Sequence, residues 1–213
     1  MNPRLHPSVD RLFEHAAGVL EPGRDLVIAA HVAVCPHCRQ GVRFGEDVGG
    51  VLLEGLTPAP LADDALARAL AAVERPAAPE PSAAKPARPD WIAFPSPALE
   101  AAWRRRRWAA PGVWVAPVIS GPGRARTYLL RVAAGMSVPR HTHRGVELVT
   151  VLKGAFKDRD GFHQPGDFAE SDASIEHRPM VTDDDECVCL VSTDAPLVAR
   201  DWIGKLFQPF VRI

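Results

Sequence analysis

The chain has 213 residues, of which 46% are hydrophobic, and its formal net charge is −1. That length suits two small domains or one large one, and the near-neutral charge gives no support to binding of nucleic acid or an anionic membrane. No apolar run approaches the roughly 18 residues of a membrane-spanning helix, and the N-terminus lacks a signal-peptide pattern, so we expect a cytoplasmic protein. Four cysteines are too few for a disulfide-stapled secreted fold.

The first 75 residues have helical patterning. An amphipathic pattern begins at Ser8 and ends in the glycines of residues 18–23, and an apolar run of helix length follows from Leu26 to Val34. The alanine-rich segment Asp63 to Arg75, acidic at its start and basic at its end, predicts a last helix. We expect four helices over 1–75, with a core so small that a structural zinc ion would supply the stability it lacks.

A His-x-x-x-Cys-x-x-Cys motif follows the apolar run and consists of His31, Cys35 and Cys38. On a helix these positions share one face, although Pro36 and His37 also allow a helix break between the cysteines. One imidazole and two thiolates are three of the four ligands of a tetrahedral zinc ion. The alternative, a redox pair, usually lies at a strand-to-helix turn, and no strand pattern is present here. The motif therefore predicts a zinc site.

The fourth zinc ligand has to come from another part of the chain. His6, just ahead of the first amphipathic pattern, is the preferred candidate. His15 and His37 remain competitors, and an exposed histidine is the ordinary interpretation of both.

Residues 76–97 contain seven prolines and six alanines, a composition that indicates an extended linker and hence a domain boundary. From 98 to 213 the periodicity becomes alternating. Short β-branched runs at Thr127 to Val132, Glu147 to Leu152 and Glu186 to Ser192 predict an antiparallel barrel or sandwich. The four arginines of 104–107 are interpreted as a solvated face rather than an RNA site, because no second basic cluster accompanies them.

A second group of metal-type residues has the pattern Gly135-x5-His141-x-His143-x3-Glu147-x6-Gly154. His141 and His143 lie two apart, so they point to the same side of a strand, and Glu147 is at an even separation from both. A tight turn at 165–167 and then His177 follow. Three imidazoles and one carboxylate suit a divalent transition metal.

These spacings resemble the first cupin motif, and Pro165-Gly166-Asp167 with His177 resembles the second. Cupins are small antiparallel β-barrels that hold a metal ion. The resemblance implies His141, His143, Glu147 and His177 as ligands of a second divalent metal ion, for which zinc is the expected identity.

The His31 motif in a short helical unit also resembles the zinc-binding anti-sigma domain. The two modules in this order resemble the ChrR-type anti-sigma factors over nearly the whole chain, including His6, the Cys187-x-Cys189 pair and the Phe207-Gln208-Pro209 ending. That resemblance implies an α+β multidomain protein, with a four-helix zinc domain (1–75), a linker (76–97) and a cupin barrel (98–213). It also implies a partner, an extracytoplasmic-function sigma factor that is released in response to singlet oxygen or related oxidative stress.

Two alternatives remain beside this hypothesis. Metal cupins include dioxygenases, so the chain could be an enzyme with an accessory zinc domain. Direct DNA binding is disfavoured because residues 1–75 carry ten acidic and seven basic side chains. Cys187 and Cys189, two apart on a predicted strand, should point to one face, where they bond to each other poorly. Buried packing is their ordinary interpretation, and a sensing role is the alternative.

Overall fold

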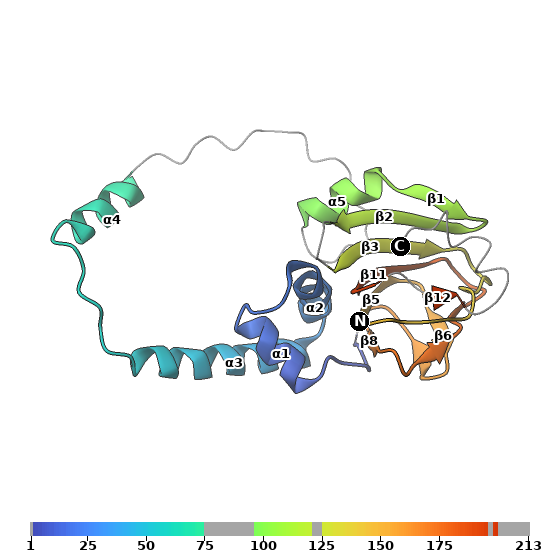
Figure 1. The fold of residues 1–213 in the computed structure, drawn as a ribbon, viewed down its shortest axis with the longest axis horizontal. Coiled ribbons are helices and arrows are strands. Elements are labelled where there is room, and N and C mark those ends of the chain that lie inside the picture. The colour runs from blue at the N-terminus through green and yellow to red at the C-terminus, as the bar shows by residue number, and fades with distance from the viewer. Residues whose placement is uncertain (1, 75–95, 121–124, 196–197, 200–213) are drawn as a thin grey trace.

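The computed structural model describes residues 2–74, 96–120, 125–195 and 198–199 (Figure 1). Most of the expected linker, 76–95, and the Phe207-Gln208-Pro209 ending therefore lie outside the described residues. The helices are α1 (Val9–Ala16), α2 (Pro22–Val34), α3 (Pro36–Glu54), α4 (Ala65–Glu74) and α5 (Pro97–Arg104). In the described part of the chain no helix is long and apolar enough to cross a membrane.

Local capping explains where the first helices begin and end. The Ser8 hydroxyl accepts a hydrogen bond from the Arg11 amide at the start of α1. Cys35 ends α2 and begins α3, because its extended backbone and the proline that follows stop one helix and start the next. The helix break allowed by Pro36 is thus confirmed. His31 lies in α2, Cys35 between the helices and Cys38 in α3, so the three residues do not share one face of a single helix.

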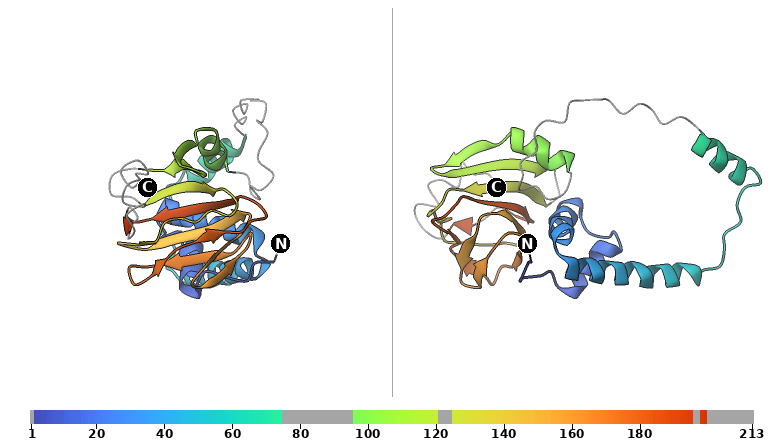
Figure 2. Two further views of the ribbon diagram at one scale, coloured as in Figure 1. Left: turned by 90° about the vertical axis from the view of Figure 1, so that its right-hand side faces the viewer. Right: turned by 180° about the vertical axis from the view of Figure 1, so that it is seen from behind.

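Helices α1, α2 and α3 pack against one another, whereas no residue of α4 is buried. The expected four-helix core is therefore not confirmed, since only three helices share it. Figures 1 and 2 show α3 extending away from the sheet and α4 standing apart from the other helices.

The strands that follow are short and antiparallel. Their bounds are β1 (Arg107–Ala110), β2 (Val113–Ile119), β3 (Arg126–Val132), β4 (His141–Thr142), β5 (Glu147–Lys153), β6 (Phe156–Asp158), β7 (Gly161–His163), β8 (Phe168–Ser171), β9 (Glu176–His177), β10 (Met180–Val181), β11 (Cys187–Thr193) and β12 (Val198–Ala199). The three strands predicted from sequence correspond to β3, β5 and β11, which lie side by side.

The strands form three sheets, with the orders β1-β2-β3-β11-β5-β8, β10-β6-β7 and β12-β4-β9. Within the described ranges these sheets do not close into one barrel, so the antiparallel architecture is confirmed and the closed barrel is not. The central strand β11 is buried at every position, which reflects the covering of both faces of the large sheet.

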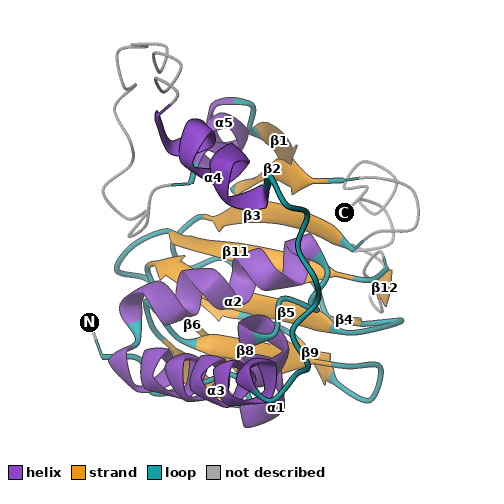
Figure 3. Cartoon of the chain, turned by 90° about the vertical axis from the view of Figure 1, so that its left-hand side faces the viewer, coloured by secondary structure: helices purple, strands orange, loops and turns teal. Residues whose placement is uncertain are grey.

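The two faces of the large sheet have different neighbours. One face, with Cys189 and Val191, turns toward the smaller sheets. The other face carries Leu129, Leu148 and Leu190, which form one cluster with Val27 and Ile28 of α2. Figure 3 shows α2 lying across the middle strands. Helices α1, α2, α3 and α5 therefore share one hydrophobic core with this face of the large sheet.

Candidate metal centres

The first group of metal-type side chains lies at the junction of α2 and α3. It consists of His6, His31, Cys35 and Cys38, whose ligand atoms lie within 4.8 Å of one another. His31 Nε2 is 3.2 Å from Cys38 Sγ, and His6 Nδ1 is 3.4 Å from each sulfur. Ligand atoms around a tetrahedral zinc ion are separated by about 3.3–3.8 Å, given its usual bond lengths. The group therefore has the spacing that zinc requires.

Hydrogen bonding fixes the tautomer of His31. Its Nδ1 atom lies 2.7 Å from the carbonyl oxygen of Gly166, and a carbonyl can only accept, so Nδ1 carries the proton. The lone pair of Nε2 is then directed at the sulfur of Cys38. This arrangement, in which the outer nitrogen donates to the protein, is the usual one for a metal-bound histidine.

The electrostatics of this group also favour a cation. Burial, followed by the adjacent Cys35 sulfur, raises the pKa of the Cys38 thiol to about 12. Burial lowers the pKa of His31 to about 4, so its ring stays neutral and able to ligate. A divalent ion would stabilise the thiolate that burial disfavours.

The competing histidines are placed elsewhere. His15 Nδ1 is 2.6 Å from Asp25 Oδ1, in a hydrogen bond between α1 and α2. His37 is exposed, with its ring centroid 5.2 Å from that of His6, and it does not belong to the group. The structure thus brings His6, the preferred candidate, beside the motif.

The second group consists of His141, His143, Glu147 and His177, all buried and again within 4.8 Å of one another. His141 and His177 are directly opposite in the β4–β9 pair, which places their Nε2 atoms 3.0 Å apart. His143 follows β4, with its Nε2 atom 3.2 Å from that of His177, and Glu147 begins β5 with Oε2 3.8 Å from His143 Nε2. These separations suit ligands converging on one transition metal ion.

The outer nitrogens of two of these histidines are held by acceptors. His141 Nδ1 donates to the carbonyl of Pro139 at 2.8 Å, and His177 Nδ1 donates to Asp158 at 3.3 Å. The same carboxylate binds His163 Nε2 at 3.0 Å. Both Nε2 lone pairs therefore face the centre of the group. Asp158 and His163 were not predicted from the sequence, where the alternation of β6 and β7 was the available signal.

Burial sets the charges of this group as well. It raises the pKa of Glu147 to about 7, and it lowers the pKa of His143 to about 4, with smaller contributions from His141 and His177. Burial thus disfavours the ionised carboxylate of Glu147, which a divalent ion would stabilise. The donor set fits a metal ion in both charge and geometry.

A small cavity of about 70 Å³ lies beside the second group, lined by His141, Glu147, His177 and mostly apolar side chains. Cys187 and Cys189 also line it, which confirms that they share one face. Their sulfurs are 3.6 Å apart and not bonded to each other. Three of the four metal-type residues and both thiols thus face one interior space.

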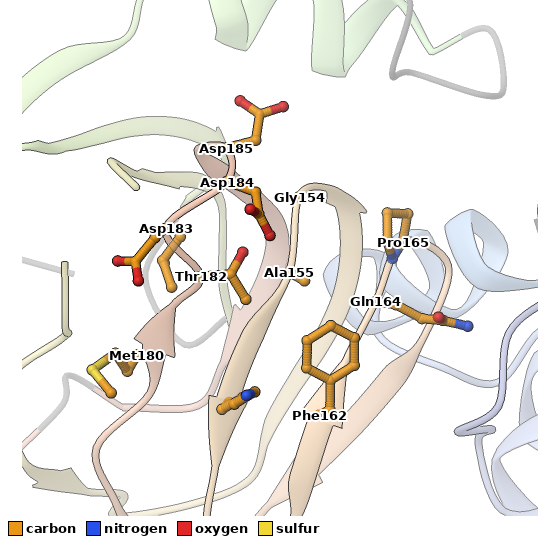
Figure 4. A pocket seen from close by; sticks show the side chains of 12 residues that line it. Gly154, Ala155, Phe162, Gln164, Pro165, Met180, Thr182, Asp183, Asp184 and Asp185 are labelled. Atoms are coloured by element: carbon orange, nitrogen blue, oxygen red, sulfur yellow. The ribbon is translucent and has the colours of Figure 1, made fainter. Parts of the chain in front are cut away.

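A larger, open cavity of about 620 Å³ lies at the rim of the smaller sheets, away from both groups. Figure 4 shows Asp183, Asp184 and Asp185 on one side of it, and Phe162 and Pro165 on the other. None of the eight residues predicted as ligands lines this cavity.

One further feature was not predicted, an apolar surface on α3 and α4. It consists of two rows on separate helices, Val48, Val51 and Leu52 on α3 and Leu66, Leu70 and Val73 on α4, and we call the two rows together the α3–α4 apolar face. These side chains recur at helical spacing, yet Val51 is 70% exposed and Val73 is 84% exposed. The 3.6-residue periodicity in 48–52 and 66–73 was the available signal.

Comparisons with known proteins agree with these observations. A model of the family described as "ChrR Cupin-like domain" matches residues 99–196. The anti-sigma-E factor ChrR of Cereibacter sphaeroides is 36% identical over an alignment of 217 residues that spans all of both chains.

One solved structure gives the same relationship. A crystal structure of Rhodobacter sphaeroides SigE in complex with the anti-sigma ChrR matches with a TM-score of 0.73 and 34% identity, covering 91% of this chain and 99% of that one. An RmlC-like cupin protein from Ralstonia eutropha matches with a TM-score of 0.42 and 21% identity, covering 47% of this chain and 70% of that one.

Proposed function

This chain belongs to the family of the anti-sigma factor ChrR, and on that premise we propose that it binds and inhibits an extracytoplasmic-function sigma factor. It acts as a regulator of transcription rather than as an enzyme. The dioxygenase alternative has lost its support, because the relationship extends over the whole chain and not over the cupin-like part alone.

The single observation that carries this proposal is the α3–α4 apolar face. A monomeric protein rarely leaves a row of large apolar side chains in water, and such a helical row is the usual way in which a helix docks into a partner's groove. Leu66, Leu70 and Val73 are all exposed, and no element of the described part of the chain covers them. A sigma factor that packed on α3 and α4 would bury this surface.

The domain division that supports this function is 1–75 for sigma binding, 76–97 for the connection and 98–213 for the cupin-like input. In the first unit, His6, His31, Cys35 and Cys38 would hold zinc. With four protein ligands this zinc has no open position for chemistry, so its role is structural.

In the cupin-like unit, His141, His143, Glu147 and His177 would hold a second divalent ion, with zinc as the expected identity. The proposed input is singlet oxygen or a related oxidant, which would change the cupin-like unit and weaken the grip on the sigma factor. Such a response requires the signal to bind or modify one state of the protein in preference to the other.

Surface variants test the proposed docking face. Val51→Glu and Leu70→Glu each place a charge in the α3–α4 apolar face without disturbing a buried side chain. Each should weaken binding to a purified extracytoplasmic-function sigma factor by more than about tenfold, since a buried unpaired charge costs several kcal/mol.

The matched control is Trp108→Glu, which adds the same charge at an exposed apolar residue of β1, 58% exposed and outside the face. It should bind the sigma factor as the unmodified chain does. Binding that survives both face variants would contradict the proposed surface. The absence of binding by the unmodified chain to any sigma factor of its own genome would contradict the proposed function.

A further inference from the structure

Gly166 and Asp167, in the turn between β7 and β8, contact His31 and the segment that carries His6, both of which lie more than 130 residues earlier in the chain. The Gly166 carbonyl accepts from His31 Nδ1 at 2.7 Å, and the buried Asp167 carboxylate binds the backbone amides of Arg4 and Leu5. We infer that Gly166 and Asp167 are positioning residues of the N-terminal zinc site, so that the cupin-like unit completes that site. This inference rests on the proposed zinc binding.

The contact of Asp167 fixes the segment that carries His6. Its Oδ1 atom lies 2.6 Å from the Arg4 amide and 3.2 Å from the Leu5 amide, while its Oδ2 atom accepts from the Gln164 amide at 2.9 Å. The Phe168 amide donates to the Leu5 carbonyl at 3.0 Å. Residue 5 is therefore held on both sides, directly before His6. Charge-assisted bonds of this kind to a buried carboxylate are stronger than neutral ones.

The contact of Gly166 requires a glycine. Its φ is +92°, and an added Cβ would lie 2.8 Å from Pro3 Cγ and 3.2 Å from Val34 Cγ2. Both neighbours belong to the segments that flank the metal group. An alanine at this position would strain the turn and push Pro3 and Val34 away, which would displace the carbonyl from His31.

Nothing within residues 2–74 replaces these contacts in the described structure. Among the described residues, His31 Nδ1 has the Gly166 carbonyl as its hydrogen-bond partner, and the Arg4 and Leu5 amides both donate to Asp167. His6 itself is exposed, so its position depends on how its own segment is held. Removal of such an outer contact typically lowers metal affinity 10- to 100-fold.

The same stretch of chain continues to the second metal group. His163 directly precedes Gln164 and binds Asp158, which in turn binds His177. The two groups are thus joined by a short run of residues, 158–167, and by hydrogen bonds at each end.

The test uses the full chain, stripped of metal and titrated with Co²⁺, whose thiolate absorption band reports the first group and not the histidine–carboxylate group. Asp167→Ala and Gly166→Ala should each weaken Co²⁺ and Zn²⁺ binding at the thiolate site at least tenfold, with affinity at the second group unchanged. Asp167→Asn keeps an acceptor oxygen for the amides of Arg4 and Leu5, so its loss of metal affinity at the thiolate site should be smaller. Asp184→Ala removes an exposed carboxylate of the same unit and should change neither affinity.

Three results would count against the inference. Thiolate-site affinity within twofold of the unmodified chain in both alanine variants would overturn it and leave the zinc site standing. An equal loss at both metal groups would show a general effect on folding, which also contradicts a positioning role. An unmodified chain with no thiolate band would overturn the zinc site itself.

Discussion

His177 Nδ1 lies 3.3 Å from the carboxylate of Asp158. Asp158 is not a predicted ligand, but this hydrogen bond orients the predicted ligand His177. Burial on its own raises the pKa of Asp158, but the hydrogen bonds from His163 and His177 outweigh it and keep the pKa below its ordinary value. The carboxylate is therefore ionised at neutral pH and fixes the His177 tautomer whose Nε2 atom faces the metal group.

Asp158→Asn should lower the affinity of the second group for Zn²⁺ by about 10- to 100-fold, because an amide offers one acceptor oxygen where the carboxylate serves two histidines. Chelator competition on the full chain measures it. Asp160→Asn, at an exposed position two residues away, is the matched control and should bind as the unmodified chain does. Equal affinities in the two variants would show that Asp158 has no such role.

Removal of His6 should abolish zinc binding at the first group, whereas removal of its competitors should not. His6→Ala leaves three ligands, so we expect one metal ion fewer per chain and a lower melting temperature, since structural zinc contributes roughly 10 kcal/mol or more. His37→Ala and His15→Ala should retain full metal content. Metal content and thermal melting are the measurements, and a zinc-loaded His6→Ala protein would assign the fourth ligand elsewhere.

Zinc binding at the first group should weaken as the pH falls. Because the pKa of Cys38 is raised to about 12 without metal, this thiol is protonated throughout the range from pH 6 to 8 and must lose its proton to bind. His31, with a pKa lowered to about 4, is already neutral there and adds no dependence. We expect at least a tenfold loss of apparent affinity for each pH unit of acidification. A pH-independent affinity over this range would contradict the assignment of Cys38 as a thiolate ligand.

A chain without the second metal ion should still inhibit the sigma factor but should no longer release it under stress. His143→Ala removes a predicted ligand in the cupin-like unit, outside the α3–α4 apolar face, so the variant should still silence a sigma-dependent reporter in the dark. It should fail to release the sigma factor when photosensitiser and light are applied. A reporter that is active without stress would indicate that the metal-loaded cupin-like unit takes part in inhibition.

The features of the fold and of the metal groups that could be predicted from the sequence are those that depend on local residue spacing. The two-residue spacing of His141 and His143 correctly placed both rings in one group, and the three strands predicted from sequence are neighbours in one sheet. The sequence did not predict that Asp167 binds the amides of residues 4 and 5, because that contact joins positions more than 160 residues apart. Periodicity reports that a face is buried but not what covers it. The apolar run of α2 indicated that this helix is buried, as Val27 and Ile28 are, but it did not predict that the large sheet covers it.

The common core of α2 and the large sheet has a consequence for solubility. Leu129, Leu148 and Leu190 are at most 1% exposed while the helices cover them. A fragment of residues 98–213 would present this row of leucines to water, as a flat apolar surface of the kind that promotes aggregation. We therefore expect the isolated fragment to be recovered mainly as aggregate. For the same reason, a signalling response that shifts α2 on the sheet would keep the full chain soluble, whereas one that detaches α2 would expose the leucines.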